Sequence, residues 1–349
     1  MQRLFIELLQ VSLGNKEKLS RQPSTAEWKT ILEESRRHAI IGLLMDGLER
    51  LTEEQRPPSD ILLGWIGETH LINQTGLIHR KRAKELTQKL RSANIQTCIL
   101  KGLSSALRYP NPLSRQCGDI DVWVNGSRKS IISYMDREYE ILGNVWHHAV
   151  VKIFDDVEVE IHFHPTWLYN PCKNRKLQKW FEEQGMCLFK QNFNEEGFVE
   201  TSAEFDVVFQ LVHIFHHFVE EGIGVRHIVD YYYVLTSLSD GQRLRAKEKI
   251  GELGLKKFAS AVMYALQQLC GMRSAFMLCS PNKSEGTMFL KEILVAGNFG
   301  KTRNDNLKRN SIGRYRMMLK HYPSDVLWMI PWKIWHKGWK MRHNFEANK

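Results

Sequence analysis

The sequence is poor in cysteine and has no long uncharged apolar segment, which excludes several classes of protein. Its 349 residues include six cysteines and no Cys-x-x-Cys pair, so the spacing predicts neither a zinc finger nor a disulfide framework. No stretch reaches the roughly 18 uncharged apolar residues that a membrane span needs. The chain has no internal repeat and no low-complexity tract. We therefore expect a folded protein with free thiols in a reducing compartment, the cytoplasm.

What remains is an ordinary globular composition with a pronounced positive charge. Hydrophobic residues make up 43% and charged residues 25% of the chain, enough for one large domain or two to three smaller ones. The net charge of +10 favours an anionic partner, and a nucleotide, a nucleic acid and a lipid surface all meet that description. The apolar residues of segment 1–19 have helical spacing interrupted by Glu7 and Gln10, which predicts a first helix rather than a secretion signal.

The hydrophobic pattern changes several times along the chain. Helical periodicity dominates the N-terminal part, with Pro57 and Pro58 as an interruption, and it resumes after a loop-rich stretch that contains Asn170 and Pro171. Between these parts, short strand and helix patterns alternate, as in a small α/β unit. We expect an α+β fold in which a small mixed-sheet core is flanked by helical regions. The predicted regions are an N-terminal helical region at 1–92, the α/β core at 93–165, an irregular connection at 166–200, a C-terminal helical domain at 201–310, and a basic, tryptophan-rich tail at 311–349.

Four segments of the core have the pattern of strands. Between the first two, the residues SSALRY predict a helix, and Asp155 with Asp156 predict a tight turn between the last two. The strand segments are IQTCILKG at 95–102, DIDVWV at 119–124, HAVVKIF at 148–154 and VEVEIHFH at 157–164.

The second and fourth of these segments have acidic side chains on one face. Because residues two apart in a strand point the same way, Asp119 and Asp121 share a face, about 7 Å apart along the backbone. Such carboxylates repel each other unless a cation such as Mg²⁺ lies between them. If VEVEIHFH lies beside DIDVWV, Glu160 becomes a third carboxylate. Three acidic groups around one or two Mg²⁺ ions suit phosphoryl or nucleotidyl transfer.

These motifs resemble those of a known group of proteins. The residues LKG, then Arg115, then GDIDVWV, and later EIH are similar to the polymerase-β-like nucleotidyltransferase superfamily, and more narrowly to the uncharacterised bacterial nucleotidyltransferases. The resemblance covers residues 95–165, about a fifth of the chain. It implies transfer of a nucleoside monophosphate from a triphosphate such as ATP to a hydroxyl acceptor, which is not identified. A weaker likeness involves the helices that contain His213, His217, Arg226 and Asp230.

The resemblance also implies roles for individual residues. Asp119 and Asp121 would be metal ligands, and Glu160 would help to activate the attacking hydroxyl. Gly102 would let the backbone approach the triphosphate. The sequence departs from the superfamily by one residue, because Leu103 separates that glycine from the serine that follows. The remaining triphosphate contacts would come from Lys101, Ser104 and Arg115.

Each of these roles has a plainer alternative. Glu160 can belong to the solvated face of an edge strand, and Lys101 can be a surface lysine. Arg115 can form a structural ion pair with Asp119 or Asp121. His162 either hydrogen-bonds to Glu160 or is simply exposed. The histidines at 213, 216 and 217 suggest zinc, but a buried polar network with Arg226 and Asp230, which ties the domains together or lines a cleft, is favoured.

The function and the tail leave alternatives as well. The chain can be a catalytically inactive nucleotidyltransferase-fold module that binds RNA, a nucleotide or a lipid surface, whereas a glycosyltransferase is disfavoured. The tail from residue 311 has a net charge of +6, and Pro331 predicts a break in its helical pattern unless it begins a helix. Its helix would lie on an anionic membrane or pack inward, and we favour packing. Trp328, Trp332, Trp335 and Trp339 would share one face, and Lys333, Lys337 and Lys340 another.

Overall fold

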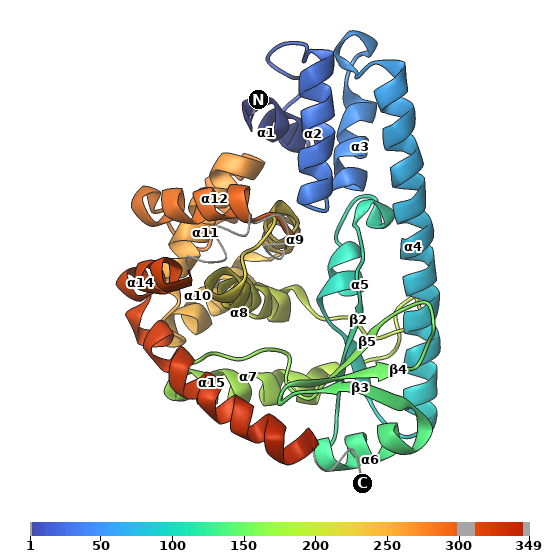
Figure 1. The fold of residues 1–349 in the computed structure, drawn as a ribbon, viewed down its shortest axis with the longest axis vertical. Helices are drawn as coiled ribbons and strands as arrows, with labels where there is room; N and C mark the ends of the chain where they lie inside the picture. Colours follow the sequence, from blue (N-terminus) through green and yellow to red (C-terminus); the bar gives the residue numbers. More distant parts are fainter. Residues whose placement is uncertain (1, 299–310, 345–349) are drawn as a thin grey trace. The chain divides into compact units, whose positions relative to one another are not determined.

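The computed structural model describes residues 2–298 and 311–344, which belong to two compact units. Each unit is assembled from three separate segments of the chain, coloured by position in Figure 1. Unit 1 consists of Met1–Leu77, Ala106–Cys117 and His217–Asn310, and unit 2 consists of Ile78–Ser105, Gly118–His216 and Ser311–Lys349. No helix within the described residues is both long enough and apolar enough to cross a membrane.

The N-terminal part of unit 1 is helical, as the periodicity predicts. Ser24 and Glu27 form a capping box that starts the second helix, and Pro57 with Pro58 lies directly before the fourth. Leu8, Trp28 and Leu44 are fully buried. The helices are α1 (Gln2–Ser12), α2 (Thr25–Arg37), α3 (Ile41–Arg50) and α4 (Ser59–Ser92), with a short 3-10 helix η1 (Glu53–Gln55) before α4.

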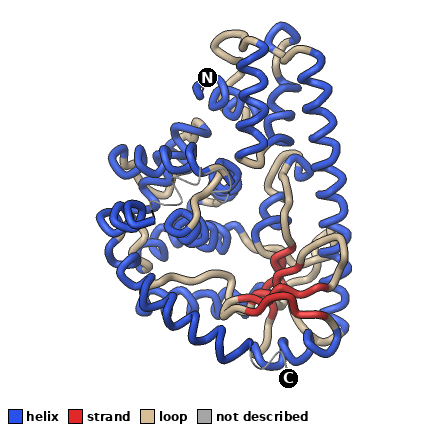
Figure 2. The backbone as a smooth tube through the Cα atoms, viewed as in Figure 1, coloured by secondary structure: helices blue, strands red, loops and turns tan. Residues whose placement is uncertain are grey.

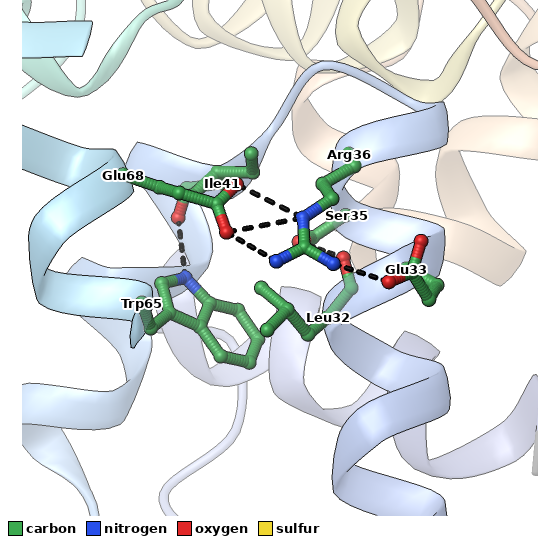
Figure 3. A network of polar contacts seen from close by, with 7 residues as sticks. All are labelled: Leu32, Glu33, Ser35, Arg36, Ile41, Trp65 and Glu68. Atoms are coloured by element: carbon green, nitrogen blue, oxygen red, sulfur yellow. Dashed lines mark hydrogen bonds and ion pairs between the residues drawn. The ribbon is translucent and has the colours of Figure 1, made fainter. Parts of the chain in front are cut away.

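Polar contacts join three of these helices, as Figure 3 shows. The indole nitrogen of Trp65 in α4 donates to the carbonyl oxygen of Ile41 at the start of α3, at 3.0 Å. Arg36 of α2 donates to the carboxylate of Glu68 in α4, with its Nε at 2.9 Å, and also pairs with Glu33. Because Trp65 is fully buried, its hydrogen bond also satisfies a donor that is shielded from water.

The C-terminal part of unit 1 is also helical, which confirms the helical pattern predicted after residue 224. Eleven of the twelve residues of α9 are buried, so this helix is the centre of the unit. Its helices are α9 (Val225–Thr236), α10 (Asp240–Glu252), α11 (Lys256–Cys270) and α12 (Lys283–Ala296), with a short 3-10 helix η3 (Ser274–Phe276). The middle segment of unit 1 contains another short 3-10 helix, η2 (Pro112–Ser114).

Unit 2 contains a single five-stranded mixed sheet, drawn in red in Figure 2. The strand order is β1-β2-β5-β4-β3, and only the β2–β5 pair is parallel. β5 is therefore the central strand rather than an edge strand. The strands are β1 (Thr97–Ile99), β2 (Ile120–Val124), β3 (Glu140–Asn144), β4 (His148–Lys152) and β5 (Val159–His162).

Strand β2 is buried on both faces. Ile120, Val122 and Val124 fill one face, as the alternation predicts. On the other face, Trp123 packs among aromatic side chains and has its ring 4.7 Å from that of Phe189 and 5.7 Å from that of Phe205. The helices that complete unit 2 are α5 (Lys101–Ala106), α6 (Arg128–Glu138), α7 (Pro171–Leu188), α8 (Ala203–Glu220), α14 (Ser311–His321) and α15 (Pro323–Asn344), with the ends of α5 and α8 and the first half of α4 counted in unit 1.

The α+β class with helical flanks is confirmed, whereas two local predictions are wrong and two elements have no counterpart in the predictions. The stretch 166–200 is not wholly irregular, because Asn170 caps α7 and Pro171 is its first residue, where a proline costs no hydrogen bond. Helix α6 and strand β3 were not predicted, and both lie largely at the surface, where the pattern is weak. Pro331 lies inside one continuous helix, α15. The five predicted regions do not coincide with the two units, which interleave along the chain.

Candidate metal site

Three carboxylates converge at the parallel strand pair of unit 2. Asp121 of β2 and Glu160 of β5 are direct register partners, and Asp119 lies just before β2. One oxygen from each of the three carboxylates lies within 4.8 Å of the others. Residues far apart in sequence therefore form a single acidic cluster, and the distance between its oxygens suits shared coordination of a hard cation.

The carboxylate of Asp121 is buried and only half satisfied. Its Oδ1 accepts hydrogen bonds from Lys101 Nζ at 2.9 Å and from His162 Nε2 at 2.8 Å. Its Oδ2 is buried and has no hydrogen-bond partner among the described residues. A buried carboxylate oxygen without a partner is costly, and a divalent cation held jointly with Asp119 and Glu160 would satisfy it. The residues present therefore fit a metal ion.

The charges around the cluster support one another. Burial alone would disfavour the charge on His162, but its bonds to Asp121 and Glu160 raise the pKa of its ring to about 9. Burial likewise opposes the charge on Glu160, yet His162, Lys101 and His148 lower the pKa of its carboxyl group to about 2. Burial opposes the charge on Lys101, and the three carboxylates raise the pKa of its amine above the ordinary value. At neutral pH, Glu160 is ionised and available as a ligand.

His148 is a member of the site that the sequence did not indicate. It pairs with His162 across the β4–β5 hairpin, and its Nδ1 lies 3.7 Å from Glu160 Oε2. His148, Glu160 and His162 form a second group of metal-ligand type. Burial lowers the pKa of the His148 ring to about 4, so this ring is neutral at pH 7. The histidine is visible in the sequence, but the pairing register of its strand is not. A two-residue turn at Asp155–Asp156 would pair His148 with Phe163, whereas the structure pairs it with His162.

The glycine turn after β1 lies against the acidic segment. The amide nitrogen of Leu100 donates to the carbonyl oxygen of Asp121 at 2.9 Å. Gly102 has φ +26° and ψ −98°, and a Cβ there would lie 3.6 Å from the carbonyl oxygen of Asp119. This conformation favours glycine, because L residues rarely adopt a positive φ. The turn is therefore placed beside the carboxylates, with Lys101 paired to Asp121.

Two other predicted triphosphate contacts have partners within the protein. Ser104 is buried, its hydroxyl lies 2.7 Å from that of Thr201, and it accepts a hydrogen bond from the Thr201 amide. Arg115, in unit 1, donates to both carboxylate oxygens of Asp230 at 2.8 Å. Its guanidinium is thus paired with Asp230 and not, as the sequence alternative had it, with Asp119 or Asp121. The phosphate-binding roles of Ser104 and Arg115 stay predictions.

The histidines and Arg226 of the helical part are found in different surroundings. The ring of His213, in unit 2, stacks on Phe209 at 5.9 Å. In unit 1, His217 contacts Glu221 at 3.4 Å, and Arg226 donates to the carbonyl oxygen of Gln116 at 2.8 Å. Neither metal-ligand group found among residues 2–298 and 311–344 includes a histidine of positions 213–217. Arg226 and Asp230 instead hold the segment 106–117 against α9.

Comparison with known proteins identifies a family that this chain matches. Residues 24–271 match the family model described as uncharacterised nucleotidyltransferase, and no curated protein matches the chain. One similar solved structure is an antigenic nucleotidyltransferase-like protein from Paracoccidioides brasiliensis, 16% identical, with 59% of this chain and 94% of that chain covered and a TM-score of 0.35. Another is the CCA-adding enzyme of Thermotoga maritima complexed with tRNA, 11% identical, with 76% and 73% covered and a TM-score of 0.18. TM-scores this low support no conclusion about this chain.

Proposed function

This chain belongs to the family of uncharacterised nucleotidyltransferases, and we propose that it transfers a nucleoside monophosphate from a nucleoside triphosphate, such as ATP, to a hydroxyl group of an acceptor. The observation that carries this proposal is the cluster of Asp119, Asp121 and Glu160, whose oxygens lie within 4.8 Å of one another. The bare, buried Oδ2 of Asp121 supports it, because a cation held jointly with Asp119 and Glu160 would satisfy that oxygen.

In the proposed reaction the hydroxyl oxygen forms a bond to the α-phosphorus of the triphosphate. The bond between that phosphorus and the α–β bridging oxygen breaks, and pyrophosphate leaves. Mg²⁺, when bound by the three carboxylates, would neutralise charge on the phosphate oxygens and make the hydroxyl more acidic. Glu160, which is ionised at neutral pH, accepts a hydrogen bond from the hydroxyl, whose proton then passes to solvent.

The remaining residues position these groups. Lys101 and His162 both donate to Oδ1 of Asp121, which fixes the carboxylate and leaves Oδ2 for the metal. The glycine turn at Gly102 would let the triphosphate approach the backbone, and Lys101 and Ser104, which follow the same strand, would supply contacts to it. Most of the acceleration would come from positioning and charge neutralisation, since the protein forms no covalent bond.

The acceptor and compartment follow from weaker observations. The net charge of +10 favours an anionic acceptor, so an RNA end is the first to test, followed by hydroxylated metabolites, glycans and protein side chains. We expect the reaction in the cytoplasm. Incubation of radiolabelled triphosphates, Mg²⁺ and cell extract with the protein would show which acceptor becomes labelled.

Replacement of one ligand tests the activity. We expect Asp121→Asn to lower transfer by about a thousandfold or more, because the amide cannot supply the ligand charge. Asp136→Asn, which changes an exposed aspartate of α6, is the matched control and should leave transfer unchanged. Pyrophosphate release measures the rate, and circular dichroism confirms that both variants are folded. Full transfer activity in Asp121→Asn would remove the proposal.

A second candidate function is an inactive module that binds an anionic partner. It is favoured by the contacts of Lys101 and His162, which already neutralise Asp121 without a metal. Calorimetry separates the two functions. Binding of a triphosphate that requires Mg²⁺ and is lost in Asp119→Ala supports the enzyme, whereas metal-independent binding of RNA or lipid vesicles, without transfer, supports the module.

A further inference from the structure

Helix α15 is attached to unit 2 along one face only. Met329 is buried, and the ring of Trp332 stacks on that of Trp167 at 5.1 Å and 11°. The guanidinium of Arg128 lies over the ring of Trp339 at 4.5 Å. Because successive residues of a helix are about 100° apart, these attached residues lie on one side of α15. The helix, red-orange in Figure 1, is thus a fixed part of unit 2.

The opposite face of α15 is apolar and exposed. Leu327, Ile330, Ile334 and Met341 are 58%, 53%, 69% and 63% exposed. Their spacings of three, four and seven residues place them in one row, which we call the apolar stripe. Scattered exposed apolar residues are ordinary, but four of them aligned on one helix face mark an interaction surface.

The borders of the apolar stripe identify its partner. Lys333, Lys337 and Lys340 are exposed along one edge. Trp328 and Trp335, on the other edge, are 43% and 48% exposed and line a pocket of about 390 Å³. Lysines beside an apolar row, with tryptophans at the margin, are the pattern of a helix lying in the headgroup region of a bilayer.

The charge distribution separates the possible occupants of this surface. The one acidic residue of α15, Asp325, is buried and contacts Lys173 Nζ at 2.7 Å, so the lysines that border the apolar stripe have no acidic residue of α15 exposed beside them. Two copies of the chain that meet through this face would bring their lysine rows together, which is repulsive. A nucleic acid would satisfy the lysines but not Ile330 and Ile334. An anionic bilayer satisfies both.

We propose that the apolar stripe and its lysines bind the surface of an anionic lipid bilayer. The helix lies parallel to the membrane plane, with Ile330 and Ile334 at the acyl boundary and the lysine amines beside lipid phosphates. The attached face keeps α15 on unit 2, so the nucleotidyltransferase core is held at the membrane. The sequence alone favoured inward packing of all four tryptophans, whereas two of them are exposed.

Vesicle flotation of the full chain, without nucleotide, tests the proposal. We expect at least about tenfold more protein bound to vesicles of phosphatidylcholine with phosphatidylserine than to phosphatidylcholine alone, and less at high salt. Ile334→Glu should abolish binding, whereas Leu244→Glu, which changes an exposed leucine of α10, should not. Lys337→Glu with Lys340→Glu should weaken binding more than Lys256→Glu, an exposed lysine of α11.

Each other outcome contradicts the proposal. Equal binding by Ile334→Glu and the unaltered chain would show that general charge, not the stripe, holds the vesicles. A dimer seen by light scattering without lipid, and lost in Ile334→Glu, would assign the stripe to a second copy. RNA binding that requires the lysines but not Ile334, without vesicle binding, would assign the surface to nucleic acid. Because no nucleotide is present, these results do not depend on catalysis.

Discussion

Two buried carboxylates, one in each unit, show how a closed ion pair differs from an open site. Asp230 of unit 1 uses both oxygens: Oδ1 accepts from Tyr109 at 2.7 Å and from Arg115 at 2.8 Å, and Oδ2 accepts from Arg115 at 2.8 Å. Asp121 of unit 2 leaves Oδ2 without a hydrogen-bond partner among the described residues, beside two further carboxylates. The closed pair stabilises a fold, and the open cluster can accept a ligand.

The largest expected effect concerns the closed pair. Asp230→Ala should lower the free energy of unfolding by about 3–5 kcal/mol, because it leaves the buried guanidinium of Arg115 unpaired. The same measurement on Asp121→Asn should give a much smaller loss, since that change removes one charge from a cluster of three carboxylates. Urea unfolding followed by circular dichroism provides both values. Equal losses would mean that the two sites do not differ in this way.

The response to magnesium sharpens the comparison at the open site. At ten times its dissociation constant, Mg²⁺ should raise the free energy of unfolding of the unaltered chain by about 1.4 kcal/mol. Tryptophan fluorescence is a suitable probe, since eight of the ten tryptophans belong to unit 2. Asp119→Ala should abolish the stabilisation, whereas Asp136→Asn should retain it. Stabilisation of the same size in Asp119→Ala would place the metal elsewhere.

The smallest expected effect on stability concerns Glu7, a third carboxylate, whose oxygens have partners like those of Asp230. The pH dependence of unfolding tests it. Glu7 of α1 contacts Arg3, Lys16 and the amide of Ser20. Burial disfavours its charge, but these contacts lower the pKa of its carboxyl group to about 2 from an ordinary 4.5. Its stabilisation is therefore present above pH 4.5 and lost as the pH falls through 2.

Glu7→Gln removes this titration. We expect the variant to be about 1 kcal/mol less stable than the unaltered chain at pH 7, and the two to converge near pH 2. Urea unfolding at a series of pH values measures the difference. A difference that stays constant from pH 7 to pH 2 would contradict the assigned pKa.

Much of the fold was readable because its signals are local. Apolar spacing identified the helices of both flanks, and alternation identified four of the five strands. The sequence patterns gave a wrong prediction where one residue type occurs in two kinds of structure. Asn170 and Pro171 are typical of a loop, yet Asn170 caps α7 and Pro171 is its first residue. Pro331 was expected to break the helix, but packing of Met329 and Trp332 holds both halves on unit 2.

The site was readable only in part. Asp119, Asp121 and Glu160 were readable because residues two apart share a strand face and because a glycine turn precedes, and an acidic strand follows, the Asp-x-Asp pair. His148 did not, because a one-residue change of hairpin register reverses the face of a side chain. Arg115 forms its ion pair with Asp230, a residue from another part of the chain, and no local pattern predicts that pairing.

The order of residues by itself determined which side chains share a strand face and which segments are helical, since both follow from backbone periodicity. The tertiary structure decided that β2 and β5 are parallel neighbours, that Lys101 and His162 share one oxygen of Asp121, and that α15 turns its isoleucines outward. These arrangements depend on hydrogen bonds and packing between segments that are distant in the sequence, so the pattern within any one segment cannot predict them.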